Sequence, residues 1–428
     1  MREDWNARAR EDAGYYVAFG RRDQDDEEFF ASASDVVRGL ETELRRVPAE
    51  QRTHWKALEI GCGPGRLMRP MSRHFVEIHG IDVSDEMVER AKSNLQNTPN
   101  AFVHVGDGSR LSQFADASID FVYSYAVFQH IPSRAVVLEY LDEVHRVLKP
   151  GGFARLQLNG LPLIADDQYT TWSGARFSPE ELLEFTAQRD LQVLALEGTG
   201  TQYMWTTWRK QEQGWNAQMR NRTFSDAPAR IRRITNAVSS VRAATRNGRF
   251  ASISMWVENL PDNAGLHHLR VTIDQQAATV VQIGSAGKDG VSEIFVNLPD
   301  LNATGLLPVE LRWMGMGIAP RTVLRIMEPG PTPPRVRSVT DGINILAEQQ
   351  TQTRLLRITV EELNPSRPIA ITLGETVAED IASFCIDPRQ RLYEVTCKIP
   401  DSVAPGYHNL HLKLGRQTIG PVQIAIER

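Results

Sequence analysis

The sequence predicts an α/β domain with a mostly parallel sheet, followed by two all-β sandwiches. Up to about Lys210, short apolar runs alternate with helical patterns. After Gln211 the helical period fades, and short alternating strands are separated by Pro, Gly, Asn and Asp, as in β-sandwiches. A repeat with an offset of about 101 residues runs through this second part. The length of 428 residues agrees with several domains, since one domain holds roughly 150 residues.

The α/β part consists of strand-like runs with helices between them. One helical pattern runs from Ser84 to Leu95, and another from Ser133 to Leu148 stops at a glycine-rich turn. This alternation predicts a parallel sheet with helices on both faces. Ser178 opens a further helix, and two strands joined by a glycine-containing turn then predict a hairpin. The predicted strands are 57–60, 77–82, 102–105, 119–123, 153–158, 193–197 and 203–208.

The second part is an internal repeat. Val296–Asp300 is echoed by Cys397–Asp401, and Val309–Trp313 by Leu410–Leu414, at the same offset. A Pro-rich stretch at 329–334 predicts the boundary between the two copies. We therefore predict domains at 1–210, 227–330 and 331–428, with a linker at 211–226.

Composition excludes several classes of protein. The formal net charge of −5 argues against a globally basic nucleic-acid binder. No run of about 18 apolar residues occurs and the first residues are charged, so we expect no membrane span, no signal peptide and a cytoplasmic location. Cys62, Cys385 and Cys397 form no CxxC pair, so neither a zinc site nor a disulfide framework is indicated.

The residues that carry chemistry lie where strands of the α/β part end. The first strand runs into Gly61-Cys62-Gly63-Pro64-Gly65, whose glycines let the backbone approach a ligand closely. Arg66 stands where a dinucleotide fingerprint needs its third glycine, which disfavours NAD. Asp82 ends the second strand, where an acid can accept from ribose hydroxyls, and Asp107 ends the third, within reach of an adenine amine. These motifs predict one nucleoside site at a shared edge of the sheet.

Four motifs in order resemble those of class I S-adenosylmethionine-dependent methyltransferases. They are residues 58–65, 80–84, 106–108 and a helix-to-strand signature at 144–152. The resemblance implies a Rossmann-like methyltransferase fold, with a seven-stranded, mostly parallel sheet whose last strand is antiparallel. It implies S-adenosylmethionine as cofactor, S-adenosylhomocysteine as product and no metal. The cofactor-binding residues that it implies are Glu59, Gly61, Cys62, Gly63 and Gly65 on the methionine side, Asp82 and Val83 at the ribose, Asp107 and Gly108 at the adenine, and Ser124 and Tyr125 at the sulfonium.

On the acceptor side, a base is needed only where the acceptor loses a proton. His130 lies near the methyl group by the family pattern and suits a base at neutral pH, while a capping or packing histidine is the alternative. Asp166-Asp167 is similar to a metal pair of catechol-type relatives, but the fourth strand lacks the matching carboxylate, so we expect an acceptor loop there. The predicted acceptor and lid residues are Tyr15, Tyr16, Phe128, Tyr169 and Trp172.

The second copy opens with Pro334-Arg335-Val336 and has Ile399-Pro400-Asp401 before its penultimate strand and Gly420-Pro421-Val422 before its last. With these motifs the two sandwiches, especially the second, resemble the IPT/TIG branch of immunoglobulin-like domains, modules that usually bind a partner or act as spacers and do not catalyse. Two functions follow. In the first, the chain methylates a small-molecule acceptor on O or N, and the sandwiches serve assembly into a homo-oligomer or acceptor positioning. In the second, it is a cofactor-binding scaffold or sensor whose sandwiches bind a partner protein or an acidic polymer, aided by the arginine-rich stretch 220–249. Neither a membrane nor a nucleic acid is expected as partner.

Overall fold

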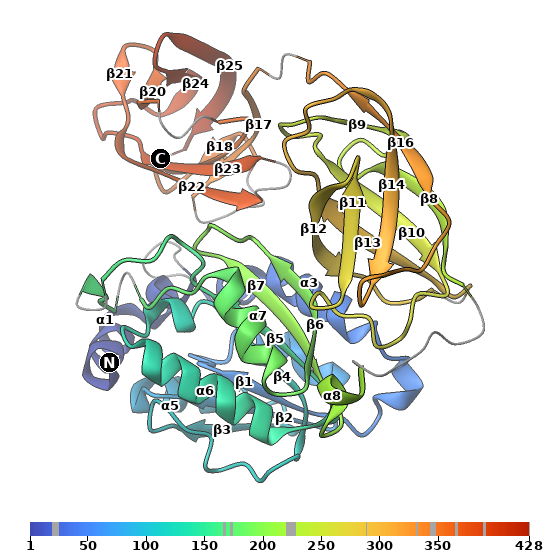
Figure 1. Cartoon of the computed structure of the whole chain (residues 1–428). Coiled ribbons are helices and arrows are strands. Elements are labelled where there is room, and N and C mark those ends of the chain that lie inside the picture. Colours follow the sequence, from blue (N-terminus) through green and yellow to red (C-terminus); the bar gives the residue numbers. More distant parts are fainter. Residues whose placement is uncertain are drawn as a thin grey trace. The chain divides into compact units, whose positions relative to one another are not determined.

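A computed structural model describes residues 1–18, 25–165, 168–171, 174–219, 228–287, 289–330, 333–342, 348–363, 367–387 and 391–427 (Figure 1). Contacts divide the chain into two compact units. The first consists of Met1–Arg10 and Ala33–Pro329, and the second of Glu11–Ser32 and Gly330–Arg428. Helix α1 (Arg2–Ala18) therefore contributes residues to both units.

The first unit contains a sheet with the strand order β3-β2-β1-β4-β5-β7-β6. Strands β1 to β5 are parallel, whereas β7 runs antiparallel between β5 and β6. Within the described residues, this arrangement agrees with the Rossmann-like methyltransferase fold predicted for this part. The bounds are β1 (Lys56–Ile60), β2 (Glu77–Asp82), β3 (Ala101–Val105), β4 (Ile119–Ser124), β5 (Leu148–Leu158), β6 (Leu191–Glu197) and β7 (Met204–Lys210).

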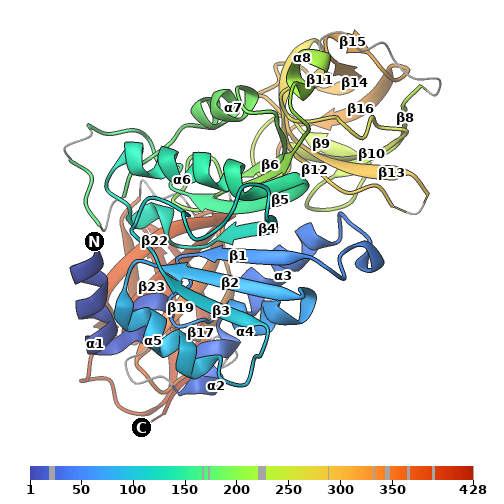
Figure 2. The same ribbon diagram turned by 90° about the horizontal axis from the view of Figure 1, so that it is seen from below.

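Alternate residues of the central strands belong to two separate cores. Leu58 and Ile60 of β1 share a core with helices α6 and α7, whereas Ala57 shares another with α3, α4 and α5. Helices therefore cover both faces of the sheet (Figure 2), and ligands of such sheets bind beyond the carboxyl ends of the strands. None of the described helices is long and apolar enough to cross a membrane. The bounds are α3 (Ser34–Leu44), α4 (Met68–Met71), α5 (Asp85–Asn94), α6 (Arg134–Val147), α7 (Pro179–Ala187) and α8 (Trp215–Met219), with 3-10 turns η1 (Ala49–Gln51), η2 (Ser72–His74) and η3 (Phe128–His130).

Serine side chains cap the three helices predicted from the sequence. The side chains of Ser84 and Ser133 accept from backbone N–H groups of α5 and α6, and Ser178 forms a capping box at α7. These three helices are confirmed. The predicted start of the fifth strand was wrong, because β5 begins at Leu148, which pairs with Ile119. An irregularity in the ladder between β4 and β5 accommodates the turn-forming residues 149–152.

The remainder of the first unit is rich in strands and is joined to β6. Leu266 N donates to Val193 O (2.9 Å), and Gln282 of β12 pairs with Ala195 of β6. Its apolar side chains belong to the same core cluster as those of α6 and α7. The strands are β8 (Arg230–Asn236), β9 (Ala243–Thr245), β10 (Ser252–Glu258), β11 (Leu269–Ile273), β12 (Gln276–Ile283), β13 (Val291–Asn297), β14 (Gly305–Trp313), β15 (Met316–Gly317) and β16 (Thr322–Met327).

The second unit holds α2 (Asp26–Ala31) and two sheets that share one core. One sheet has the order β17-β19-β23-β22 and the other the order β18-β25-β24-β20-β21. Ile358 of the first and Leu412 of the second lie in the same buried cluster. The strands are β17 (Arg335–Asp341), β18 (Gln350–Thr351), β19 (Leu355–Glu361), β20 (Ile369–Leu373), β21 (Thr376–Val377), β22 (Glu379–Asp387), β23 (Leu392–Lys398), β24 (Gly406–Leu414) and β25 (Gln417–Ile426).

The internal repeat is confirmed at the level of strands and their pairing. Strands β23 and β24 begin and end 101 residues after β13 and β14. Strand β10 pairs with β8 and β13, and its counterpart β19 pairs with β17 and β23. In each copy a short parallel strand joins the second sheet, β9 beside β16 and β18 beside β25. The immunoglobulin-like identity of the copies stays a prediction.

Candidate functional site

The glycine turn after β1 follows a path that requires glycine. Gly61, Gly63 and Gly65 have φ angles of 70°, 50° and 85°, in the left-handed region. A Cβ atom on Gly61 would lie 2.2 Å from Cγ2 of Val127, and one on Gly65 would lie 2.9 Å from Cδ1 of Leu95. Side chains at these positions would therefore push the turn away from its neighbours.

Asp82 joins the end of β2 to the glycine turn. Its Oδ2 accepts a hydrogen bond from Gly63 N (2.8 Å), and its Oδ1 accepts one from Ser84 N (2.9 Å). Burial raises the pKa of the Asp82 carboxyl above its usual value, against the opposing effect of these N–H groups. Each carboxylate oxygen can accept two hydrogen bonds, so the Asp82 carboxylate can accept further hydrogen bonds from a ligand. Such an acceptor fits the hydroxyl groups of a ribose.

Asp107 and Gly108 follow β3 at the same edge of the sheet. Asp107 is exposed, and its Oδ1 accepts hydrogen bonds from Ser109 N and Arg110 N, both at 2.8 Å. Gly108 has a φ of 100°, and a Cβ there would lie 3.4 Å from Cγ2 of Val83. The segments that follow β2 and β3 therefore approach each other at Val83 and Gly108.

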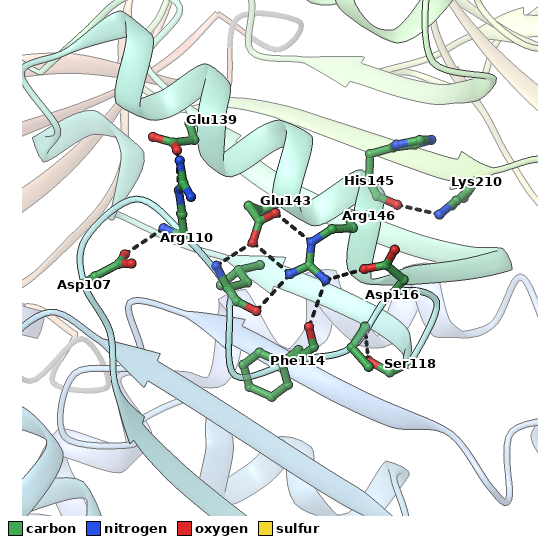
Figure 3. A network of polar contacts seen from close by, with 12 residues as sticks. Asp107, Arg110, Phe114, Asp116, Ser118, Glu139, Glu143, His145, Arg146 and Lys210 are labelled. Carbon is green, nitrogen blue, oxygen red and sulfur yellow. Dashed lines mark hydrogen bonds and ion pairs between the residues drawn. The ribbon is translucent and has the colours of Figure 1, made fainter.

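Arg146 of α6 stabilises the loop between β3 and β4 through hydrogen bonds, a role that sequence reasoning missed (Figure 3). Its guanidinium donates to Phe114 O (2.9 Å), Leu111 O (3.0 Å) and the Asp116 carboxylate (2.7 Å). Glu143, one turn earlier, accepts from Arg146 at 2.7 and 2.8 Å and from Leu111 N at 2.8 Å. Arg146 was part of the 144–152 signature, but nothing in that pattern indicates these partners.

Buried polar groups lie on the methionine side implied by the resemblance. Glu59 is 3% exposed, and the Tyr123 hydroxyl donates to its Oε2 (2.9 Å). Burial raises the pKa of Glu59 to about 8, so this carboxyl is protonated at neutral pH. Ser124 Oγ donates to Ile60 O (2.9 Å). Burial also raises the pKa of the Cys62 thiol, which is therefore neutral.

Tyr125 lies in an aromatic stack with two residues that sequence reasoning missed as site neighbours. Its ring is parallel to that of Trp205 within 4°, at 5.6 Å, and lies 6.5 Å from the ring of Tyr203. The Arg66 guanidinium lies 5.9 Å from the Tyr125 ring on the side of the glycine turn. The aromatic content of the predicted 203–208 strand was the available signal for this stack.

His130 is buried after β4, between two other segments. Its Nδ1 lies 2.9 Å from Thr171 O, and its Nε2 lies 3.3 Å from the side-chain nitrogen of Gln129. The Trp5 ring of α1 lies edge-on to the imidazole at 5.5 Å. Burial lowers the pKa of His130 and the charge of Arg8 adds to this, while the Thr171 carbonyl opposes it. The imidazole is therefore neutral at pH 7.

The first residues of α1 contact the segments that follow three strands. Arg2 donates to Gly106 O after β3 (2.6 Å), and Ser84 Oγ after β2 donates to Asn6 Oδ1 (2.6 Å). Trp5 contacts the imidazole after β4. This start of the helix therefore lies across the strand ends that carry the predicted site residues.

Two predicted acceptor residues are buried in the core of the first unit. Phe128 is 1% exposed and packs edge-on against Tyr140, because η3 turns its side chain toward α6. Tyr169 is also buried, and its hydroxyl donates to Ile164 O (3.2 Å). Neither aromatic ring is exposed at the strand ends.

The other predicted acceptor residues lie in the second unit or outside the described residues. Tyr15 and Tyr16 belong to the second unit, where Tyr16 O–H donates to Glu11 (2.8 Å). Trp172 and the pair Asp166-Asp167 lie outside the described residues. In the part of the chain that the structure describes, no three His, Cys, Asp or Glu side chains form a group that could hold a metal ion.

Comparisons with known proteins find similarity within the α/β part. Residues 58–156 match the family model described as a methyltransferase domain. Over 99 residues, 22% of this chain and 28% of the relative, the sequence is 38% identical to an uncharacterised 37.1 kDa protein of a Streptomyces fradiae transposon. Over 96 residues, 22% of this chain and 29% of the relative, it is 35% identical to 2-methyl-6-phytyl-1,4-hydroquinone methyltransferase of Synechocystis.

This chain thus spans less than a third of the length of each of these relatives. Among solved structures, the YcgJ protein of Bacillus subtilis is similar with a TM-score of 0.34 and 20% identity, over 42% of this chain and 99% of that one. The family match covers the stretch that holds the glycine turn, Asp82 and Asp107.

Proposed function

We propose that this chain transfers a methyl group from S-adenosylmethionine to the oxygen or nitrogen of a small molecule, without a metal ion. The observation that carries the proposal is the hydrogen bond from Gly63 to Asp82, within the stretch that matches a methyltransferase domain. This hydrogen bond joins the glycine turn after β1 to Asp82 at the end of β2, the two parts that a nucleoside site at this edge of the sheet requires. The hydroquinone in the name of the Synechocystis relative supports a small acceptor.

The cofactor would lie along the carboxyl ends of β1 to β4. Two observations support this placement: the Asp82 carboxylate can accept further hydrogen bonds, and the Asp107 carboxylate is exposed. Bound there, S-adenosylmethionine supplies an electrophilic methyl group on its sulfonium. In this proposal Asp82 and Val83 hold the ribose, Asp107 and Gly108 the adenine, Glu59, Gly61, Cys62, Gly63 and Gly65 the methionine part, and Ser124 and Tyr125 border the sulfonium.

His130 would act as the base where the acceptor loses a proton. The Thr171 carbonyl only accepts hydrogen bonds, so Nδ1 carries the ring hydrogen and Nε2 carries the basic lone pair. The lowered pKa of His130, which burial causes, keeps Nε2 unprotonated near neutral pH, and its lone pair becomes free for the acceptor once Gln129 releases its hydrogen bond.

We propose in addition that residues 1–210 are the catalytic domain of a cytoplasmic protein, followed by a linker at 211–226. Residues 227–330 and 331–428 would be immunoglobulin-like sandwiches that serve assembly or acceptor positioning. The repeated strand pairing of the two copies supports this division.

Calorimetric titration of the full chain tests the function. We expect binding of S-adenosylmethionine and S-adenosylhomocysteine but not of NAD, and absence of heat with both sulfur nucleosides would refute the assignment. The variant Asp82→Ala should bind S-adenosylhomocysteine about 1.5–3 kcal/mol more weakly, the loss expected for hydrogen bonds to a charged group. The control Asp35→Ala removes an exposed carboxylate of α3 and should bind normally. Unchanged affinity of Asp82→Ala would place the ribose elsewhere.

A further inference from the structure

Gln157 of β5 is a fully buried polar side chain to which the proposed reaction assigns no role. Its Oε1 accepts a hydrogen bond from Ala126 N (2.8 Å), and its Nε2 donates to Gln202 O (2.7 Å) and Leu158 O (3.0 Å). A backbone N–H only donates and a carbonyl only accepts, so these contacts allow one orientation of the Gln157 amide.

The amide of Gln157 in turn orients Gln129. Gln129 Oε1 is the third acceptor near Gln157 Nε2 (3.0 Å), so one of the two hydrogens of this nitrogen is shared between two acceptors. With its oxygen on Gln157, the Gln129 side chain has its nitrogen facing His130 Nε2 at 3.3 Å. Because an amide nitrogen only donates, His130 Nε2 must accept. Ala126, which donates its N–H to Gln157, has a φ of 57°. A residue other than glycine adopts this conformation only where its surroundings impose it.

The contact at the second ring nitrogen of His130, Nδ1, independently requires the same tautomer. Thr171 O lies 2.9 Å from His130 Nδ1 and only accepts, so Nδ1 must carry the hydrogen. The contacts at both ring nitrogens therefore place the hydrogen on Nδ1 and the lone pair on Nε2. Gln129 and His130 are 2% and 3% exposed, so no bulk water competes for these bonds.

We propose that Gln157 is a positioning residue that, through Gln129, holds His130 in the tautomer with the hydrogen on Nδ1. This tautomer places the basic lone pair on Nε2, where it accepts from Gln129, so a proton transfer from the acceptor to Nε2 requires that Gln129 first release this bond. The assignment of that proton transfer rests on the proposed function, whereas the tautomer itself follows from the hydrogen bonds alone.

Nitrogen-15 NMR of the full chain labelled at histidine tests the inference. A spectrum of His130→Asn identifies the His130 signals by their loss, and in the native chain we expect hydrogen on Nδ1. Gln157→Met keeps the length and the buried volume of the side chain but removes the partner of Gln129. The ratio of the Nδ1–H to the Nε2–H tautomer should then fall about tenfold, as for the loss of one hydrogen bond.

The matched control is Gln192→Met on β6. Gln192 is 1% exposed and donates to two carbonyls, those of Asp262 and Ala264, which belong to a different segment from the hydrogen bonds around Gln129 and His130. This variant should leave the His130 tautomer ratio as in the native chain. A fall equal to that in Gln157→Met would show a general effect of core disruption and overturn the positioning role.

Two further results would overturn the inference: hydrogen on Nε2 in the native chain, or an unchanged ratio in Gln157→Met. If Gln157→Met does not fold, Gln129→Met tests the same step, since it removes the donor to Nε2 and keeps the backbone bonds of Gln157. An unchanged ratio there overturns the inference as well. Calorimetry with S-adenosylhomocysteine separates the two proposals, because absence of binding refutes the methyltransferase and leaves the tautomer assignment standing.

Discussion

Replacing Arg146 by lysine should destabilise the α/β part of the chain and weaken cofactor binding. The planar guanidinium donates at once to Leu111 O, Phe114 O and the carboxylates of Asp116 and Glu143 (Figure 3). A lysine ammonium keeps the positive charge, but it is a single compact group that cannot donate in all of these directions at once. Arg146→Lys therefore removes the two bonds to backbone carbonyls and keeps an ion pair.

The size of the effect follows from the partial burial of this side chain. A hydrogen bond to a charged group contributes about 1.5–3 kcal/mol when buried. The Arg146 side chain is 28% exposed, and water can replace it at the released carbonyls. We therefore expect about 1 kcal/mol for each lost bond and about 2 kcal/mol in total, which lowers the melting temperature of this part by about 4–8 °C.

Scanning calorimetry measures this change, with the transition of the α/β part identified by its shift on adding S-adenosylhomocysteine. The control is Arg110→Lys in the same loop, where the exposed arginine has an ion pair with Glu139, and the change should stay within about 0.5 kcal/mol. Arg146→Lys should also bind S-adenosylhomocysteine more weakly, because the loop carries Asp107. Equal melting temperatures for the two variants would refute the role assigned to Arg146.

Three further predictions concern catalysis, pH and domain structure. If the acceptor is a hydroxyl, His130→Ala should lower turnover by about 10²–10⁴-fold in steady-state assays and keep cofactor affinity; reduced affinity with normal turnover would make His130 a structural residue. The pKa of Glu59 is raised by burial to about 8 from the model-compound value of 4.5, so its contribution to stability is full below the lower value and is lost as pH rises through the higher one. Glu59→Gln should therefore gain unfolding free energy relative to the native chain from about pH 5 to 8 in urea titrations, and a constant difference would contradict this sign. A fragment of residues 1–213 should bind S-adenosylhomocysteine but melt at a lower temperature than the same part of the full chain, because the bond from Leu266 N to Val193 O is lost; a soluble fragment without binding would show that the later residues complete the site.

Local signals made the strand ends of the site predictable. Glycines at alternate positions, an acid at the end of the next strand and a serine before a helix each act within a few residues. The structure accordingly places Gly63, Asp82 and Ser84 in one connected group. Short apolar runs separated by helical patterns were sufficient for the sheet, since each parallel strand must bury both of its faces.

The polar interior was not predictable in the same way. Gln157, Gln129 and Thr171 come from three separate segments, and no periodicity indicates which buried amide meets which carbonyl. Phe128 was assigned to the acceptor side because it follows β4, but the turn η3 directs its ring into the core. A one-dimensional pattern places a residue along the chain, whereas the direction of a side chain in a short turn depends on the packing of neighbouring helices.

The start of helix α1, which contacts the segments after β2, β3 and β4, has a kinetic consequence. If a nucleoside binds at those strand ends as proposed, we expect the contacts that hold this helical segment to slow its release. Two of its attachments are ion pairs, Arg2 with Asp85 and Arg10 with Glu86, and all four side chains are more than 40% exposed. Counterions screen such pairs within about 10 Å at 0.1 M salt. We therefore expect the off-rate of a bound nucleoside to rise with salt concentration, even where the direct contacts of the nucleoside stay the same.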